Sequence, residues 1–168
     1  INKVKNEFNR IKSLGFIVNT RSSLNDGAIG NTFEDQLGVI ENNLKDPDFE
    51  GWEVKTKRKF TSSWMSLYTK KPTHPENGDD YMRKKFGVPD KTYTNINCFR
   101  TTLFCNRYSL VYKKFKIKMN VNRDEKKLRI LFCDLNENII DKNVYWSLDD
   151  IEKGSKKIEK MFVIEAEQ

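Results

Sequence analysis

Hydrophobic residues recur at helical spacing at the start of the chain. Residues 2–14 predict an amphipathic helix, which Gly15 can end. The apolar positions of this helix are Val4, Phe8, Ile11 and Leu14. After a polar loop over residues 21–31, we expect a second helix with Thr32 as its N-cap and Asp35 three positions on, a variant of the capping box. Its apolar positions are Phe33, Leu37, Ile40 and Leu44, and the sequence Asp46-Pro47-Asp48 ends it.

Alternating apolar and polar residues predict β-strands further along the chain. The clearest strand covers residues 52–57, because successive side chains of a strand point to opposite faces. One face carries Trp52, Val54 and Thr56, and the other carries Glu53, Lys55 and Lys57. Strands are also expected over residues 64–69, 99–105 and 162–166. The segments 112–121 and 128–132, joined by a turn at 123–126, predict a β-hairpin.

Helices expected over residues 79–86 and 147–160 complete the pattern. The predicted order of helices and strands favours an α/β (α+β) fold, with a mixed β-sheet flanked by helices. The 168 residues fit one domain. No apolar run approaches the roughly 18 residues that indicate a membrane span.

The composition indicates which kinds of partner and chemistry to expect. The formal net charge is +7 at pH 7, which favours a polyanionic partner, although a lysine- and asparagine-rich chain is also what an A/T-rich genome encodes. Three cysteines form no CxxC pair, and the only histidine, His74, lies in a proline-flanked loop. A disulfide scaffold and a Cys/His zinc site are therefore disfavoured, and a reducing cytoplasm is expected. Any hydrolytic chemistry is expected to use carboxylates and a metal.

One group of residues around the strand at 52–57 suggests such chemistry. Asp48 precedes the strand, and Glu53 and Lys55 share one face of it, about 7 Å apart. Two converging carboxylates can hold a hard cation such as Mg²⁺ with a water between them. A neighbouring lysine can orient that water and offset charge on a phosphate. The pattern predicts phosphodiester cleavage, although Glu-x-Lys pairs are also common on ordinary solvated strands.

Other residues near this group could belong to the same site. Glu34 lies beside the apolar face of the second helix and could point into a cleft, or it could be an acid that the helix dipole favours. The basic residues that could contact a DNA phosphate backbone are Lys57, Arg58, Lys59, Lys70, Lys71 and Arg83. A solvated basic face is the alternative interpretation of each of them.

Several ordered motifs resemble one nuclease family. They are Gly30-Asn-Thr-Phe-Glu-Asp-Gln-Leu-Gly38, Glu41-Asn-Asn-Leu44, Pro47-Asp-Phe followed by Glu53-Val-Lys-Thr56, Ser66-Leu-Tyr-Thr-Lys-Lys-Pro-Thr73, Met82-Arg-Lys-Lys-Phe-Gly87, Val144-Tyr-Trp-Ser147 and Ile164-Glu-Ala-Glu167. Together they span nearly the whole chain and closely resemble the MvaI/BcnI family of type II restriction endonucleases, nearer to its MvaI branch. The core also resembles the mismatch-repair nickase MutH, which shares the order of a helix Glu, an Asp and Glu-x-Lys.

The resemblance implies a PD-(D/E)xK nuclease fold and Mg²⁺-dependent hydrolysis of double-stranded DNA. Asp48, Glu53 and Lys55 match the catalytic residues of the family, with Asp48 and Glu53 as metal ligands. Glu34 matches the helix Glu near the site. The family acts as a monomer on short CC-N-GG-like sites, by direct attack of water. A cognate DNA methyltransferase is expected in the same restriction system, although not as a physical partner.

The resemblance also raises a question about the extent of the chain. Family members continue well beyond the stretch that matches Ile164–Glu167. We therefore expect residues 1–168 to be a single catalytic domain without the C-terminal DNA-reading part. The leading hypothesis is a site-specific endonuclease, and the alternatives are a MutH-like nickase and a non-catalytic DNA-binding module. Intact Asp48, Glu53 and Lys55 argue against the last alternative, whereas the expected lack of a reading part argues for it.

Overall fold

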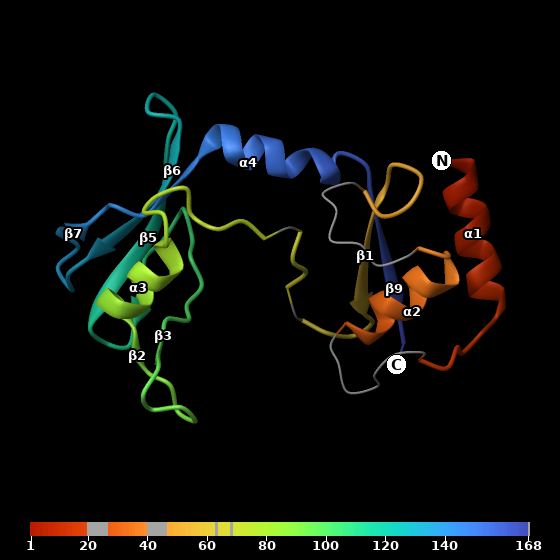
Figure 1. The fold of residues 1–168 in the computed structure, drawn as a ribbon, viewed down its shortest axis with the longest axis horizontal. Coiled ribbons are helices and arrows are strands. Elements are labelled where there is room, and N and C mark those ends of the chain that lie inside the picture. Colours follow the sequence, from red (N-terminus) through yellow and green to blue (C-terminus); the bar gives the residue numbers. More distant parts are fainter. Residues whose placement is uncertain (20–26, 40–46, 63, 68, 168) are drawn as a thin grey trace. The chain divides into compact units, whose positions relative to one another are not determined.

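The computed structural model of the protein describes residues 1–19, 27–39, 47–62, 64–67 and 69–167. The chain forms two compact units (Figure 1). Unit 1 consists of Ile1–Thr69 together with Ser155–Gln168, and unit 2 consists of Lys70–Gly154. In sequence, unit 2 is therefore an insertion within unit 1. No helix in the described segments is long and apolar enough to span a membrane.

Unit 1 contains two helices and a pair of parallel strands (Figure 1). These elements are α1 (Asn2–Ser13), α2 (Ala28–Gln36), β1 (Glu53–Arg58) and β9 (Met161–Ala166). The two strands pair from Glu53 opposite Met161 to Arg58 opposite Ala166. Parallel strands need a long crossover connection, and here that connection contains all of unit 2. The buried side chains of the unit 1 core are Ile11, Phe33, Val54 and Ile164.

The start of α2 differs from the prediction. The helix begins at Ala28, inside the segment 21–31 that was expected to be a loop, and Thr32 lies within it rather than at its N-cap. A Cβ atom on Gly30 would lie 3.1 Å from the Oγ1 atom of Thr56 on β1. Glycine is a poor helix former, but here its missing side chain lets the helix backbone approach the strand. Packing against β1 therefore extends α2 through residues whose local preferences favour a loop.

Both helices of unit 1 end near a glycine. Helix α1 ends at Ser13, as predicted to within one residue, and Gly15 has a φ of 71°. Helix α2 ends at Gln36, and Gly38 has a φ of 70°. Glycine adopts this left-handed conformation without steric cost. The further apolar positions predicted for the second helix, Ile40 and Leu44, lie outside the described residues.

Unit 2 is built around a five-stranded antiparallel sheet. Its elements are α3 (Gly78–Phe86), β2 (Val88–Pro89), β3 (Asn97–Cys98), β4 (Ser109–Val111), β5 (Phe115–Asn122), β6 (Lys127–Cys133), β7 (Ile139–Asp141) and β8 (Tyr145–Ser147). Strands β4, β5, β6 and β7 are neighbours in that order, and β8 also pairs with β6. The helix α4 (Leu148–Ser155) and a 3₁₀ turn (Lys156–Ile158) lead back into β9.

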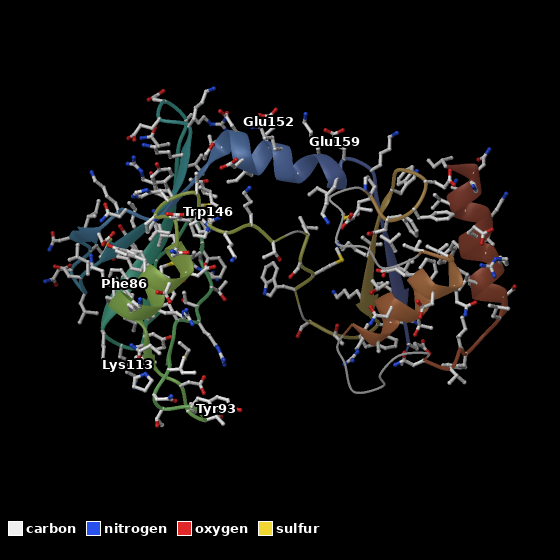
Figure 2. All side chains as sticks on the ribbon, viewed as in Figure 1. Phe86, Tyr93, Lys113, Trp146, Glu152 and Glu159 are labelled. Carbon is white, nitrogen blue, oxygen red and sulfur yellow. The ribbon has the colours of Figure 1, made fainter. Side chains whose placement is uncertain are left out.

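The core of unit 2 is rich in aromatic side chains from α3 and the sheet. Its buried members are Met82, Phe86, Val111, Phe115, Ile117, Ile130, Phe132 and Val144. Phe86 on α3 stacks on Phe132 of β6, with ring centroids 3.8 Å apart. Trp146 on β8 packs against the same core (Figure 2). Because α3 and the sheet share this apolar contact, burial of aromatic surface holds the helix in place.

The predicted hairpin is confirmed, with one change at its start. Strands β5 and β6 pair from Lys116 opposite Cys133 to Asn122 opposite Lys127. The expected first strand began at Tyr112, but Tyr112 and Lys113 both have positive φ and form the turn after β4. The apolar alternation that runs from Phe115 to Val121 is interrupted at Lys113, where this turn lies, so the predicted strand was extended too far toward its start. The final strand at 162–166 is confirmed as part of β9, and the helix at 79–86 as part of α3.

Three other predicted elements differ from the structure. No strand forms among the described residues of the segment 64–69, where Trp64 is 91% exposed. The segment 99–105 also lacks a strand, and the pairing in that region lies just before it, in β3. In place of the single helix predicted over 147–160, an α-helix ends at Ser155 and a 3₁₀ turn follows over Lys156–Ile158. Strand-like composition without a neighbouring strand to pair with is insufficient to form a sheet.

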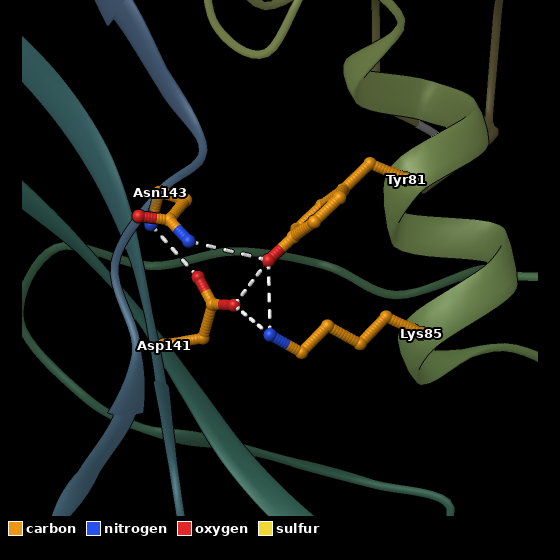
Figure 3. A network of polar contacts seen from close by, with 4 residues as sticks. All are labelled: Tyr81, Lys85, Asp141 and Asn143. Carbon is orange, nitrogen blue, oxygen red and sulfur yellow. Dashed lines mark hydrogen bonds and ion pairs between the residues drawn. The ribbon is translucent and has the colours of Figure 1, made fainter.

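A polar network joins α3 to the sheet of unit 2 (Figure 3). The Asp141 carboxylate at the end of β7 accepts hydrogen bonds from the Tyr81 hydroxyl and from the Lys85 ammonium group of α3. The backbone N–H of Asn143 donates a further hydrogen bond to it, over 2.8 Å. Burial raises the pKa of Asp141, but the bonds from Asn143, Lys85 and Tyr81 outweigh burial and hold this pKa below its ordinary value. The network therefore stabilises the ionised carboxylate in the folded state.

We expect Asp141→Asn to lower the free energy of unfolding at pH 7 by about 2 kcal/mol, because the network loses its negative charge and one of its two accepting oxygens. A lowered pKa in the folded state stabilises the protein above the unfolded pKa of about 3.9, and this stabilisation is lost as the pH falls through the folded value. Urea unfolding at pH 7 and in the acid range measures both effects. Asp124→Asn, in the exposed β5–β6 turn, is the matched control. Equal stability of the two variants would contradict the prediction.

Candidate active site

Glu53 is a buried acid at the first position of β1. The residue is only 1% exposed. Its backbone N–H donates to the carbonyl oxygen of Lys160 over 2.8 Å, which fixes the start of β1 against the residue preceding β9. Burial of a charged carboxylate is costly unless cations or hydrogen-bond donors compensate it. The neighbours of Glu53 therefore determine whether this position is stable.

Two lysines bind the same oxygen of Glu53. The Nζ atom of Lys55 lies 2.5 Å from Oε1 of Glu53, and the Nζ atom of Lys157 lies 2.9 Å from the same atom. Lys55 reaches it because residues two apart on a strand share a face. Lys157 comes from the 3₁₀ turn before β9, more than 100 residues later in the sequence. Two positive charges thus compensate the buried acid.

The second oxygen of Glu53 has a different environment. Its Oε2 atom is buried and accepts no hydrogen bond from any side chain or backbone group in the described part of the chain. A buried carboxylate oxygen without a donor is unfavourable. A divalent cation would satisfy it, because Mg²⁺ prefers carboxylate oxygen ligands. The donor set at the start of β1 therefore fits a hard metal ion.

Asp48 reaches the same end of β1 by way of a tight turn. Phe49 and Trp52 exchange two backbone hydrogen bonds, of 3.0 and 2.8 Å. Between them, Glu50 and Gly51 both have positive φ, the geometry of a tight two-residue hairpin turn, in which glycine is favoured at the second position. The turn brings the Oδ2 atom of Asp48 to 2.9 Å from the backbone N of Val54, which donates a hydrogen bond to it. The Asp48 and Glu53 carboxylates therefore flank the first residues of β1.

Glu34 lies on α2, next to the buried Phe33 and half-buried itself. The helix packs on β1 through the close approach of Gly30 to Thr56 described above. However, no three Asp, Glu, His or Cys side chains of the described residues form a group that could hold a metal. The structure thus brings Asp48, Glu53 and Lys55 to one strand end without adding Glu34 as a third ligand. Its role near the site stays a prediction.

The predicted phosphate-contacting residues divide between the two units. Lys57 and Arg58 are half-buried on β1, and Lys59 follows them, ion-paired to Glu167 over 2.7 Å. The others belong to unit 2. They are Lys70, which lies 4.0 Å from Asp150, the exposed Lys71, and Arg83, which pairs with Asp80 over 2.5 Å. Ion pairs with Lys84 and Arg83 hold the pKa of Asp80 below its ordinary value.

Sequence reasoning missed Lys157. Its only sequence signal is a Lys-Lys pair at 156–157 in the segment 147–160, which was predicted to be a helix. Nothing in that pattern connects Lys157 with Glu53. The connection depends on the parallel pairing of β1 with β9, which places the turn before β9 beside the first residue of β1. No local spacing rule could have indicated it.

Comparisons with known proteins agree with this description. The sequence profile of the MvaI/BcnI restriction endonuclease family matches residues 5–168. The solved structure of restriction endonuclease MvaI in complex with its cognate DNA substrate is similar, with a TM-score of 0.88 and 30% sequence identity. The alignment covers 99% of this chain and 66% of the MvaI chain. This similarity confirms the mixed α/β fold predicted from the sequence.

A second solved structure, restriction endonuclease MvaI in the absence of DNA, has a TM-score of 0.56 and 28% identity. That alignment covers 82% of this chain and 55% of the MvaI chain. The protein thus spans slightly less than two thirds of the MvaI chain it matches most extensively. A comparison with curated proteins gave no significant match. Because the family profile covers nearly every residue, the chain belongs to the MvaI/BcnI restriction endonuclease family.

Proposed function

We propose that this protein is a site-specific endonuclease that hydrolyses double-stranded DNA. The observation that carries the proposal is the environment of Glu53, a buried carboxylate with two lysines on one oxygen and, among the described residues, no donor on the other. Asp48 supplies a second carboxylate at the same strand end. Membership of a restriction endonuclease family supports the same function. Within it, we propose a short CC-N-GG-like target site and action as a monomer.

The proposed reaction depends on Mg²⁺. A bound Mg²⁺ would act as a Lewis acid on the phosphodiester and favour deprotonation of water. Asp48 and Glu53 would hold it through their carboxylate oxygens, one of which is the unpartnered Oε2 of Glu53. The Lys55 ammonium group would orient the attacking water and offset negative charge that develops on the phosphate. Direct attack of water requires no covalent intermediate on the protein.

The distribution of charge supports DNA as the partner. Unit 2 contains 18 Lys and Arg against 12 Asp and Glu, a net charge of +6. Unit 1 contains 13 Lys and Arg against 12 Asp and Glu, a net charge of +1. Nearly all of the excess positive charge thus belongs to the inserted unit, while the carboxylates of the proposed site belong to unit 1. We propose that unit 2 adds phosphate contacts to those of Lys57, Arg58 and Lys59, and that unit 1 also supplies the chemistry.

Plasmid cleavage with Mg²⁺, and with EDTA as a control, tests the proposed function. We expect double-strand cuts at fixed positions in Mg²⁺ and none in EDTA. Nicks alone would indicate a nickase, and intact plasmid would contradict nuclease activity.

Asp48→Ala and Glu53→Ala should each abolish cleavage but retain DNA binding, because loss of a carboxylate also relieves repulsion of phosphate. Wild-type cleavage by either variant would show that the site lies elsewhere.

Lys55 provides a second test of the site. We expect Lys55→Ala to be inactive and Lys55→Arg to lose at least about 100-fold in cleavage rate, within the range for a group that stabilises transition-state charge. A planar guanidinium is larger than an ammonium group and does not replace it beside a small water. Single-turnover cleavage rates at saturating Mg²⁺ measure the effect. Lys5→Arg, on the exposed surface of α1, should leave the rate unchanged. Full activity of Lys55→Arg would mean that Lys55 supplies only surface charge.

The salt dependence of DNA binding tests the phosphate contacts. If the six predicted basic residues neutralise about six phosphates, log affinity should fall with log salt at a slope near −5. Lys71 is exposed and makes no ion pair within the described residues, so Lys71→Ala should reduce this slope by about 1. Competition titrations in Ca²⁺ at several salt concentrations measure the slope. Lys5→Ala is the control, and an equal slope for both variants would remove Lys71 from the DNA interface.

A further inference from the structure

Lys157 has no role in the proposed chemistry, yet it makes one of the two ion pairs to the buried Glu53. Its Nζ atom lies 2.9 Å from Oε1, and its side chain is 30% exposed. The preceding residue, Lys156, is exposed to solvent. The structure therefore distinguishes two adjacent lysines of identical chemistry, one bound to the candidate metal ligand and the other on the surface.

The position of Lys157 is fixed by the backbone. It belongs to the 3₁₀ turn that leads into β9, and the carbonyl oxygen of Lys160 accepts a hydrogen bond from the N–H of Glu53. Parallel pairing then continues along six residues of β1 and β9. The side chain of Lys157 thus reaches Glu53 from a segment that the sheet itself holds in place.

Lys55 and Lys157 share one carboxylate oxygen, Oε1 of Glu53. The proposed function, on which this inference rests, requires Lys55 to turn toward water and the phosphate. When Lys55 leaves Oε1, this buried oxygen still needs a donor even with a metal ion on Oε2, because a buried carboxylate oxygen without a donor is unfavourable. We propose that Lys157 is a positioning residue that holds Glu53 and thereby releases Lys55 for the reaction.

This arrangement has a consequence for metal binding that a purely structural lysine would not have. The positive charge of Lys157 lies beside a carboxylate that would bind a divalent cation, so it weakens cation binding by repulsion and by neutralising the ligand. Removing the charge should strengthen cation binding. The same removal leaves Oε1 of Glu53 with Lys55 but without Lys157, so Lys55 is held there more firmly and cleavage should become slower. Metal affinity and cleavage rate then change in opposite directions.

The test compares Lys157→Met with Lys156→Met, the surface control. Binding of Mn²⁺ to the DNA-free protein is followed by electron paramagnetic resonance, which needs no activity. Relative to the wild type, we expect the Mn²⁺ dissociation constant of the Lys157→Met variant to be about 5-fold lower. We expect its cleavage rate at saturating Mg²⁺ to be lower by about 10-fold or more. Lys156→Met should match the wild type. Lys157→Arg, which keeps the charge, should stay within about 3-fold of the wild type in both measurements.

Two results would overturn the inference. One is Mn²⁺ binding by Lys157→Met that equals or is weaker than that of Lys156→Met, as expected if the lysine only supports the fold. The other is cleavage by Lys157→Met as fast as by the wild type. Circular dichroism of each variant shows that its fold is retained. A wild-type protein that does not cleave DNA at all would refute the proposed nuclease, whereas the Mn²⁺ measurement would still decide whether Lys157 opposes cation binding at Glu53.

Discussion

The burial of one carboxylate, that of Glu53, constrains the structure around the start of β1. Burial of a carboxylate that is 1% exposed is costly unless cations or hydrogen-bond donors compensate its charge. Lys55 does so from two residues away on the same strand, and Lys157 does so from the turn before β9. The strand pair and the turn that carries Asp48 meet at this end of β1, whereas α2 packs further along the strand, at Thr56. The other oxygen of this carboxylate has no donor in the part of the chain that the structure describes, which suits it to a metal ion.

Unit 2 depends on a different interaction. Its stability comes from an aromatic core shared by α3 and the sheet, and from the buried Asp141 that accepts bonds from Tyr81 and Lys85 of that helix. None of these residues belongs to the proposed chemistry. Unit 2 has its own core and carries a net charge of +6. The proposed metal-binding carboxylates, Asp48 and Glu53, belong to unit 1. In the proposed function, unit 2 adds phosphate contacts, whereas the metal ligands belong to unit 1.

The buried Glu53 also relates the two proposals to each other. The proposed nuclease needs Asp48 and Glu53 for a metal and Lys55 for water, whereas the inference about Lys157 concerns what holds Glu53 when Lys55 moves. The proposed nuclease site could be predicted from sequence motifs, since Asp48, Glu53 and Lys55 lie within eight positions of one another. The role proposed for Lys157 depends on a contact between segments more than 100 residues apart. Family similarity to MvaI supports the first and leaves the second to be decided by this chain's own geometry.

The sequence by itself determined the features that depend on local periodicity: helix α1, the β5–β6 hairpin, strand β1 with Glu53 and Lys55 on one face, and the mixed α/β class. Each follows from a repeat of two or 3.6 residues. Only the tertiary structure decided the start of α2, because the contact of Gly30 with Thr56 outweighs glycine's poor helix propensity. It also decided the partnership of Lys157 with Glu53. Both depend on segments distant in sequence that the parallel strands β1 and β9 and their packing bring together, and local patterns carry no information about such contacts.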